Sequence, residues 1–354
     1  MLERSSPVSL GLIGCGWVTT DRHLPALRQL PEARVVAVAD IEPDQLKRVA
    51  DRFHIERRYT DFRELLKDSD IEAVAVCTPP GFHVEAALAA LEMGKHLFVE
   101  KPLALGLDEI DRLIERARQS SSKVMVGFNL RWHRLVRQAR EMIRRGEMGR
   151  IEVVRTVFTS AMPDEETLPE WRKWRQQGGG VLLDKASHHF DLCRFLLQSD
   201  VEEVFATSRS EPFDDVTATV TARLSNGVLV SSVFAEQAGD NHEVEIYGQT
   251  GRLHVSCYFF DGLEFFPVSS SPGGLGTRLR KMVKTLTLPP GALRLRRGGD
   301  FAASYRAEWQ HFLDAIRRDV PVECTLEDGR WALQMTLAAV ESACLGRPVK
   351  VAQQ

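Results

Sequence analysis

The chain has no pair of cysteines at the C-x-x-C spacing of zinc sites and redox motifs, although it contains six cysteines in 354 residues. Scattered single cysteines are typical of small buried side chains, so we expect no disulfide framework. We expect instead a reducing, cytoplasmic environment. No apolar run reaches the roughly 20 residues that a membrane-spanning helix needs. The first residues show no cationic segment followed by an apolar one, so no secretion signal is expected.

The chain also lacks a surplus of charge, because 46 basic and 49 acidic residues leave a formal net charge of −3. No global field therefore favours nucleic acid or membrane, and we expect neither as a partner. One local exception is the basic stretch 278–297, which has no interleaved aromatic residues. A solvated face is the favoured interpretation there, and a phosphorylated or nucleotide-linked substrate stays open. Its basic residues are Arg278, Arg280, Lys281, Lys284, Arg294, Arg296 and Arg297.

The length suggests two domains, and the first third alternates short apolar runs with helical patterns. The apolar runs are continuous rather than alternating, which is typical of strands covered on both faces. The order strand–helix–strand predicts a doubly wound parallel sheet of the Rossmann type, which we assign to residues 1–127. The runs are VSLGLIG, ARVVAVAD, IEAVAVCT, HLFVEKP and KVMVGF.

A glycine-rich turn follows the first of these strands in GLIGCGWVT. Gly14 permits a tight turn, and Gly16 lets a pyrophosphate approach the backbone. Trp17 and Val18 then begin a helix whose unpaired N–H groups face the phosphates. The third position of the G-x-G-x-x-G pattern is Thr19. The pattern alone also fits an ordinary strand–helix turn.

Asp40 ends the second strand, about 20 residues after the glycines, where an acid accepts a hydrogen bond from a ribose 2′-hydroxyl. A carboxylate there repels a 2′-phosphate, which favours NAD and leaves NADP as the second option. The alternative role for Asp40 is the N-cap of the next helix. The glycine turn and the acid together, in this order, predict a dinucleotide site.

Glu100, Lys101 and Pro102 stand together at the end of the fourth of these runs, HLFVEKP. Residues just past a parallel strand lie at the cofactor edge of such a sheet, so an ammonium there can stabilise developing alkoxide charge. Pro102 fixes one backbone angle and ends the strand ladder. Without this context, a solvent-facing ion pair is the simpler interpretation.

With the Glu-Lys-Pro trio, the chain resembles the glucose–fructose oxidoreductase / inositol dehydrogenase (Gfo/Idh/MocA) family over nearly its whole length. CTPPGFH resembles the strand-four loop, and GGGVLLDKASHHFDL the helix that carries an Asp and a His four residues apart. The resemblance implies that the nicotinamide end of the cofactor lies near Thr78, Pro79, Pro80 and His83, with Glu100 and Lys101. Departures at Thr19, Ala186 and Lys185, and a segment resembling an insertion before residue 300, make transfer of a substrate from any one relative unsafe.

The resemblance implies Lys101, Asp184 and His188 as the catalytic residues. A helix beginning near Gly180 puts Asp184 and His188 on one face, and histidine titrates near neutrality, which suits proton transfer. Structural roles for both remain open. Asp184, His188 and Asp191 also suggest metal ligands. No clear further ligand stands elsewhere in the sequence, so no metal is expected.

Further substrate contacts are expected around these residues. Trp171 and Arg172, with Trp174 and Arg175, precede three glycines and resemble a mobile loop flanking the active site. Plain surface packing is the alternative for them, and surface exposure is the alternative for Lys185. Asn129 and Arg131 lie near the predicted domain junction. His189 is expected to be structural, and Asp191 to be a helix or loop hydrogen-bonding residue.

We assign residues 128–354 to an α+β domain with a large, mostly antiparallel open sheet. Runs such as VTATVTARLSNGVLV alternate polar and apolar residues around an Asn-Gly pair, which marks a hairpin. By resemblance, the open face of this sheet forms the interface of a homodimer or homotetramer.

The leading hypothesis is an NAD(P)-dependent oxidoreductase that interconverts alcohol and ketone on a sugar, cyclitol or related polyol, with Lys101 and His188 handling the proton. A non-catalytic dinucleotide sensor on the same scaffold is the alternative. A third possibility is an enzyme that reduces a carbonyl or imine, or that retains its cofactor through a redox cycle.

Overall fold

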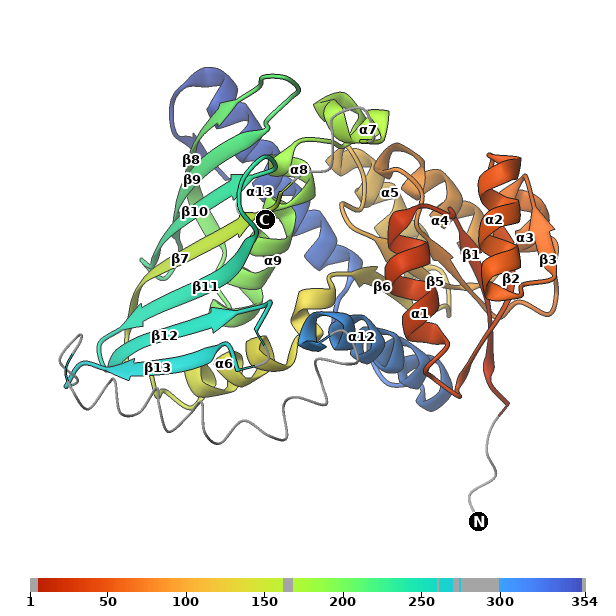
Figure 1. The fold of residues 1–354 in the computed structure, drawn as a ribbon, viewed down its shortest axis with the longest axis horizontal. Coiled ribbons are helices and arrows are strands. Elements are labelled where there is room, and N and C mark those ends of the chain that lie inside the picture. The colour runs from red at the N-terminus through yellow and green to blue at the C-terminus, as the bar shows by residue number, and fades with distance from the viewer. Residues whose placement is uncertain (1–5, 162–167, 260, 270–273, 275–298, 352–354) are drawn as a thin grey trace, which may run out of the picture. The chain divides into compact units, whose positions relative to one another are not determined.

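A computed structural model describes residues 6–161, 168–259, 261–269, 274 and 299–351. The basic stretch 278–297 lies outside the described residues. Two compact units make up the chain. The first unit comprises Met1–Asn129, Trp174–Gly179 and Tyr305–Gln334, and the second comprises Leu130–Lys173, Gly180–Ser304 and Met335–Gln354. Each unit contains one sheet (Figure 1).

The first unit is built on a six-stranded sheet in the order β3-β2-β1-β4-β5-β6, with every neighbouring pair parallel. This confirms the predicted doubly wound sheet, and β1 and β4 are buried along their whole length, as their continuous apolar runs indicate. The strands are β1 (Val8–Ile13), β2 (Ala33–Ala39), β3 (Arg57–Tyr59), β4 (Ala73–Val76), β5 (His96–Glu100) and β6 (Val124–Gly127).

Helices cover both faces of this sheet. α4 contacts both α3 and α5, while the aromatic side chain of Phe98 in β5 stacks on Trp309 of α12. The helical segments are η1 (Thr19–His23), α1 (Leu24–Leu27), α2 (Pro43–Phe53), α3 (Phe62–Lys67), η2 (Pro80–Phe82), α4 (His83–Glu92), α5 (Leu107–Arg118), η5 (Arg175–Gln177), the first residue of η3 (Asn129–Trp132), and parts of α12 (Gly299–Arg318) and α13 (Leu326–Leu345).

The second unit is built on an eight-stranded sheet in the order β13-β12-β11-β7-β10-β9-β8-β14, in which only the β7–β10 pair is parallel. The predicted mostly antiparallel sheet is thus confirmed. The strands are β7 (Ile151–Thr159), β8 (Val201–Arg209), β9 (Thr217–Leu224), β10 (Leu229–Ala235), β11 (Asn241–Gly248), β12 (Gly251–Ser256), β13 (Leu263–Pro267) and β14 (Val349–Lys350).

Side-chain alternation gives this sheet one covered and one open face. Along β9, Thr219 and Thr221 are exposed while Ala218 and Val220 are buried, and the predicted Asn-Gly turn joins β9 to β10 with Gly227 at φ +85°. Helices α8 and α9 lie on the covered side (Figure 1). The helical segments of this unit are α6 (Arg134–Arg144), α7 (Glu170–Lys173), α8 (Val181–Asp184), α9 (Ala186–Leu197) and the remaining parts of α12 and α13.

A buried ion pair fixes α9 within the second unit. The Arg131 guanidinium donates Nε–H to Asp191 Oδ2 at 2.8 Å and also contacts Oδ1, and Asp191 is 1% exposed. The ring of Phe195 lies 5.3 Å from the guanidinium carbon. This bidentate pairing gives Asp191 the hydrogen-bonding role expected of it, and the substrate contact expected of Arg131 stays a prediction.

Breaking this pair should destabilise the second unit. Arg131→Ala leaves a buried carboxylate without its cation, which costs about 3–5 kcal/mol, or about 10 °C in Tm for a domain of this size. The double variant Arg131→Met/Asp191→Leu should recover most of that loss. Thermal unfolding followed by circular dichroism measures both, with Arg150→Ala, from an exposed ion pair with Glu152, as the control. An Arg131→Ala protein as stable as the control variant would contradict this role.

Candidate active site

The glycine turn after β1 is crowded by the end of β4. Gly14 has φ +96°, and a Cβ built on it would lie 2.6 Å from the carbonyl oxygen of Cys77. Both facts restrict this position to glycine. Thr19, at the third position of the motif, is fully buried and donates its hydroxyl to the Gly14 carbonyl at 2.7 Å. Thr19 therefore stabilises the turn with a side-chain hydrogen bond that a glycine at this position could not make.

The space in front of the next helix is open. A Cβ built on Gly16 meets no atom within 4 Å, and the Trp17 side chain that follows is 61% exposed. Helical backbone begins at Trp17 and Val18. A phosphate can approach backbone N–H groups here as the sequence predicts.

The Asp40 carboxylate stands beside this turn. Oδ2 accepts from the Cys15 N–H at 2.7 Å, and Oδ1 accepts from the Glu42 N–H at 2.9 Å. The N-cap of α2 is Glu42, so Asp40 does not fill the alternative capping role. Each carboxylate oxygen keeps acceptor capacity for a ribose hydroxyl.

The loop after β4 carries one unsatisfied polar atom and one fully engaged histidine. The Thr78 hydroxyl oxygen is buried with no hydrogen-bond partner among the described residues. His83 is 1% exposed; its Nε2 lies 2.6 Å from the Thr78 carbonyl and its Nδ1 lies 2.9 Å from the Pro102 carbonyl. Burial lowers the pKa of His83, and a neutral ring donates its single N–H to one of these two carbonyls. His83 thus lies between two strand-end loops.

Glu100 and Lys101 follow in the loop after β5. Glu100 is buried, and its Oε2 accepts from the Lys101 backbone N–H at 3.0 Å, while the Lys101 side chain is half-buried. The Lys101–Pro102 peptide bond is cis. The segment Trp174–Gly179 belongs to the same unit: a Cβ on Gly178 would lie 2.8 Å from Pro80 Cγ, so the predicted flanking loop packs on the β4 loop.

In the second unit, Asp184 and His188 are the two partly exposed side chains between residues 181 and 193, where all the others are buried. The predicted single helix is divided: α8 ends at Asp184 and α9 begins at Ala186, with Lys185 still in helical conformation between them. His189 is fully buried against Phe158, as a structural histidine should be.

A charged network surrounds Asp184. Arg172 Nη2 donates to Asp184 Oδ2 at 2.6 Å and to Glu236 Oε1 at 3.2 Å, and the Asp184 carboxylate raises the pKa of this guanidinium. Lys185 is 5% exposed and donates to the Ser160 hydroxyl at 2.9 Å, 3.5 Å from Glu236 Oε1. The sequence analysis did not predict Glu236. The feature that could have indicated it is its position directly after the apolar run that forms β10.

The remaining predicted contacts differ in exposure. Trp171 and Arg172 are partly exposed, whereas Asn129 is buried at the end of the first unit.

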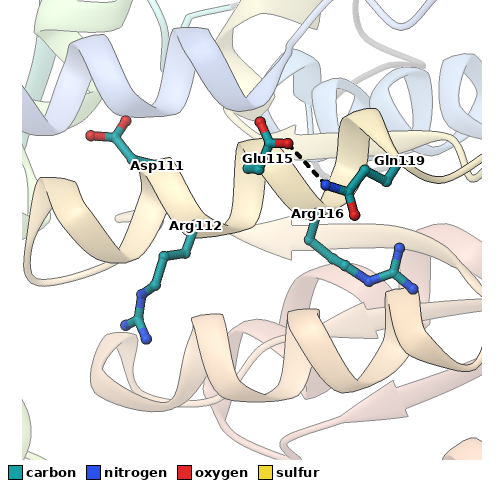
Figure 2. A pocket seen from close by; sticks show the side chains of 5 residues that line it. All are labelled: Asp111, Arg112, Glu115, Arg116 and Gln119. Carbon is teal, nitrogen blue, oxygen red and sulfur yellow. Dashed lines mark hydrogen bonds between the residues drawn. The ribbon is translucent and has the colours of Figure 1, made fainter.

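No group of three or more His, Cys, Asp or Glu residues within the described ranges is arranged to hold a metal ion. A shallow pocket on the outer face of α5 is lined by Asp111, Arg112, Glu115, Arg116 and Gln119 (Figure 2). These side chains project from a single helix and include none of the predicted site residues.

The turn, the open space at Gly16, the Asp40 carboxylate and the orphaned Thr78 hydroxyl suit a dinucleotide at the carboxyl edge of a parallel sheet. Fold and site therefore define an NAD-binding oxidoreductase. Residues 8–128 match the model for "Oxidoreductase family, NAD-binding Rossmann fold", and residues 136–254 match "GFO/IDH/MocA C-terminal domain". The chain belongs to the GFO/IDH/MocA family.

Several relatives match over nearly their whole length. Myo-inositol 2-dehydrogenase of Thermotoga maritima is 30% identical, over 97% of this chain and 98% of the relative. The 1,5-anhydro-D-fructose reductase of Ensifer adhaerens is 28% identical, over 96% and 98%. The crystal structure of a probable dehydrogenase from Thermotoga maritima has a TM-score of 0.78 at 26% identity and covers 97% of this chain and 99% of its own.

Asp40 should set the cofactor preference. Asp40→Ser removes the carboxylate that disfavours a 2′-phosphate, so NADH should bind at least about tenfold more weakly while NADPH binding improves. Fluorescence titration with both cofactors measures the two dissociation constants. Asp44→Ser, at an exposed position in α2, is the matched control. Unchanged discrimination in Asp40→Ser would remove the residue from cofactor recognition.

Proposed function

We propose that this protein is an NAD-dependent dehydrogenase or reductase acting on a CH–OH group of a sugar, cyclitol or related polyol. Two relatives matched over nearly their full length support the substrate class, because their names give a cyclitol and an anhydro-sugar as substrates. The observation that carries the proposal is the pair Asp184 and His188, left accessible in an otherwise buried stretch.

Three side chains are proposed to handle the substrate. The Lys101 ammonium donates a hydrogen bond to the reacting oxygen and stabilises its developing negative charge. His188 removes the hydroxyl proton in oxidation and returns it in reduction. Asp184, held by Arg172, orients the substrate. The nicotinamide, when bound, accepts or supplies the hydride.

Residues of the first unit are proposed to hold the dinucleotide. The backbone at Gly14, Gly16, Trp17 and Val18 takes the pyrophosphate, and Asp40 takes the ribose. Around the nicotinamide end, Thr78, Pro79 and Pro80 form one wall. His83 and Glu100 act there by holding backbone rather than by touching the cofactor.

Asn129, Arg131, Trp171, Arg172 and Lys185 complete the proposed list of substrate contacts. Arg172 is the best supported, because it is partly exposed and bonded to Asp184. The Lys185 amine contacts Ser160 and Glu236, and we propose that these side chains link it to the substrate.

We further propose NAD as the preferred cofactor and a homo-oligomer formed through the open face of the second sheet. A small molecule, rather than nucleic acid or membrane, is the proposed ligand, in a reducing cytoplasmic compartment. All six cysteines are free thiols, and five of them are buried, which suits such a compartment. No helix within the described residues is long and apolar enough to cross a bilayer.

Lys101→Ala should lower kcat by at least about 100-fold on the best substrate of a polyol and keto-sugar panel, with NADH affinity unchanged. Absorbance of reduced nicotinamide measures the rate. Lys67→Ala, an exposed lysine in α3, is the control and should match the wild type. Equal rates in Lys101→Ala and wild type would contradict the assignment.

The double variant Lys101→Ala/His188→Ala tests whether both residues serve one step. Groups that act as a unit are strongly non-additive, so the double variant should lose little more activity than the worse single variant. Losses that multiply would show two independent roles. Stoichiometric NADH binding without turnover of any polyol would favour the dinucleotide sensor instead.

A further inference from the structure

Three buried side chains far apart in the sequence form a hydrogen-bond chain in the first unit. The indole Nε1–H of Trp309 donates to His23 Nδ1 at 3.0 Å, and His23 Nε2 lies 2.9 Å from Glu100 Oε1. Trp309 and His23 are fully buried, and Glu100 is 6% exposed. None of these three side chains takes part in the proton transfer proposed above.

The tryptophan decides where the histidine carries its proton. An indole N–H can only donate, so His23 Nδ1 must accept and its single proton must sit on Nε2. Nε2–H then points at the Glu100 carboxylate as a donor. A proton on Nδ1 would face the indole N–H and lose both hydrogen bonds.

The hydrogen-bond chain ends at the backbone N–H of Lys101. Glu100 accepts from His23 through Oε1 and from the Lys101 N–H through Oε2. Gly127 makes room for this carboxylate, because a Cβ there would lie 3.0 Å from Oε1. One residue further on, the Pro102 carbonyl lies 2.9 Å from Nδ1 of the buried His83. Buried side chains therefore contact the backbone on both sides of Lys101.

Packing alone does not require this arrangement. Phe98 lies two residues before Glu100 on the same face of β5 and stacks on Trp309 with ring centroids 4.5 Å apart. Those rings already join β5 to α12. A buried carboxylate and imidazole cost free energy relative to apolar side chains, so a polar chain that ends at Lys101 indicates a positioning role.

We propose that Trp309, His23 and Glu100 form a relay that positions Lys101, with Trp309 fixing the imidazole tautomer that donates to Glu100. The proposal rests on Lys101 being the residue that binds the reacting oxygen. All three members are positioning residues, because they act through Lys101.

The first experiment reads the relay in the free protein, with no substrate. Two-bond ¹H–¹⁵N correlation spectra of ¹⁵N-histidine-labelled wild type, with His23 assigned by its loss in His23→Gln, should show the Nε2–H tautomer. Trp309→Phe keeps the ring and removes the donor, and should mix the tautomers. A wild-type His23 protonated on Nδ1, or an unchanged tautomer in Trp309→Phe, would overturn the relay.

The second experiment compares two substitutions of similar bulk. His23→Gln keeps an N–H donor for Glu100, whereas His23→Leu does not. We expect His23→Leu to lower kcat at least tenfold and to speed hydrogen exchange of the Lys101 amide, with the Kd for NADH unchanged. His23→Gln should stay within about threefold of wild type, as should the control His254→Gln in the second unit.

The two readouts separate failure of the relay from failure of the proposed function. If no polyol is turned over by the wild type, the function fails, and amide exchange at Lys101 still decides the relay. Equal kcat losses in His23→Gln and His23→Leu, or a Lys101 amide that exchanges no faster in His23→Leu, would overturn it. If His23→Leu does not fold, Trp309→Phe supplies the same comparison.

Discussion

The register of the parallel ladder in the first unit is the constraint on which the cofactor site depends. Ile13 pairs with Val76, and Val76 pairs with Val99. Because these residues are aligned, the backbone that follows each strand emerges at one edge, where the glycine turn, the Thr78 loop and Lys101 begin. A shift of one residue in any of these strands would send its side chains to the opposite face and move its loop.

Buried polar groups convert this edge from a set of loops into a fixed surface. Thr19 holds the glycine turn, His83 lies between the loops after β4 and β5, and Glu100 holds the backbone of Lys101. Losing one partner would leave a buried donor or acceptor unpaired, which costs more than the hydrogen bond itself contributes.

The sequence predicted what depends on local pattern. Apolar runs and turn residues located the strands of both sheets except the short β3 and β14, which are three and two residues long. The Gly14 turn and Asp40 were found because their spacing follows the strand–helix repeat. What it did not predict depends on partners distant in the chain: His23 and Trp309 are 286 residues apart, and Arg131 meets Asp191 60 residues on. No local pattern signals such pairs, and Glu236 was missed for the same reason.

The charged network around Asp184 bears on what we propose the protein binds. Among the described residues, the carboxylates of Asp184 and Glu236 pair with the cations of Arg172 and Lys185. Such a cluster of hydrogen-bond donors and acceptors matches hydroxyl groups well, because a hydroxyl both donates and accepts. The network therefore supports the proposed polyol class of substrate.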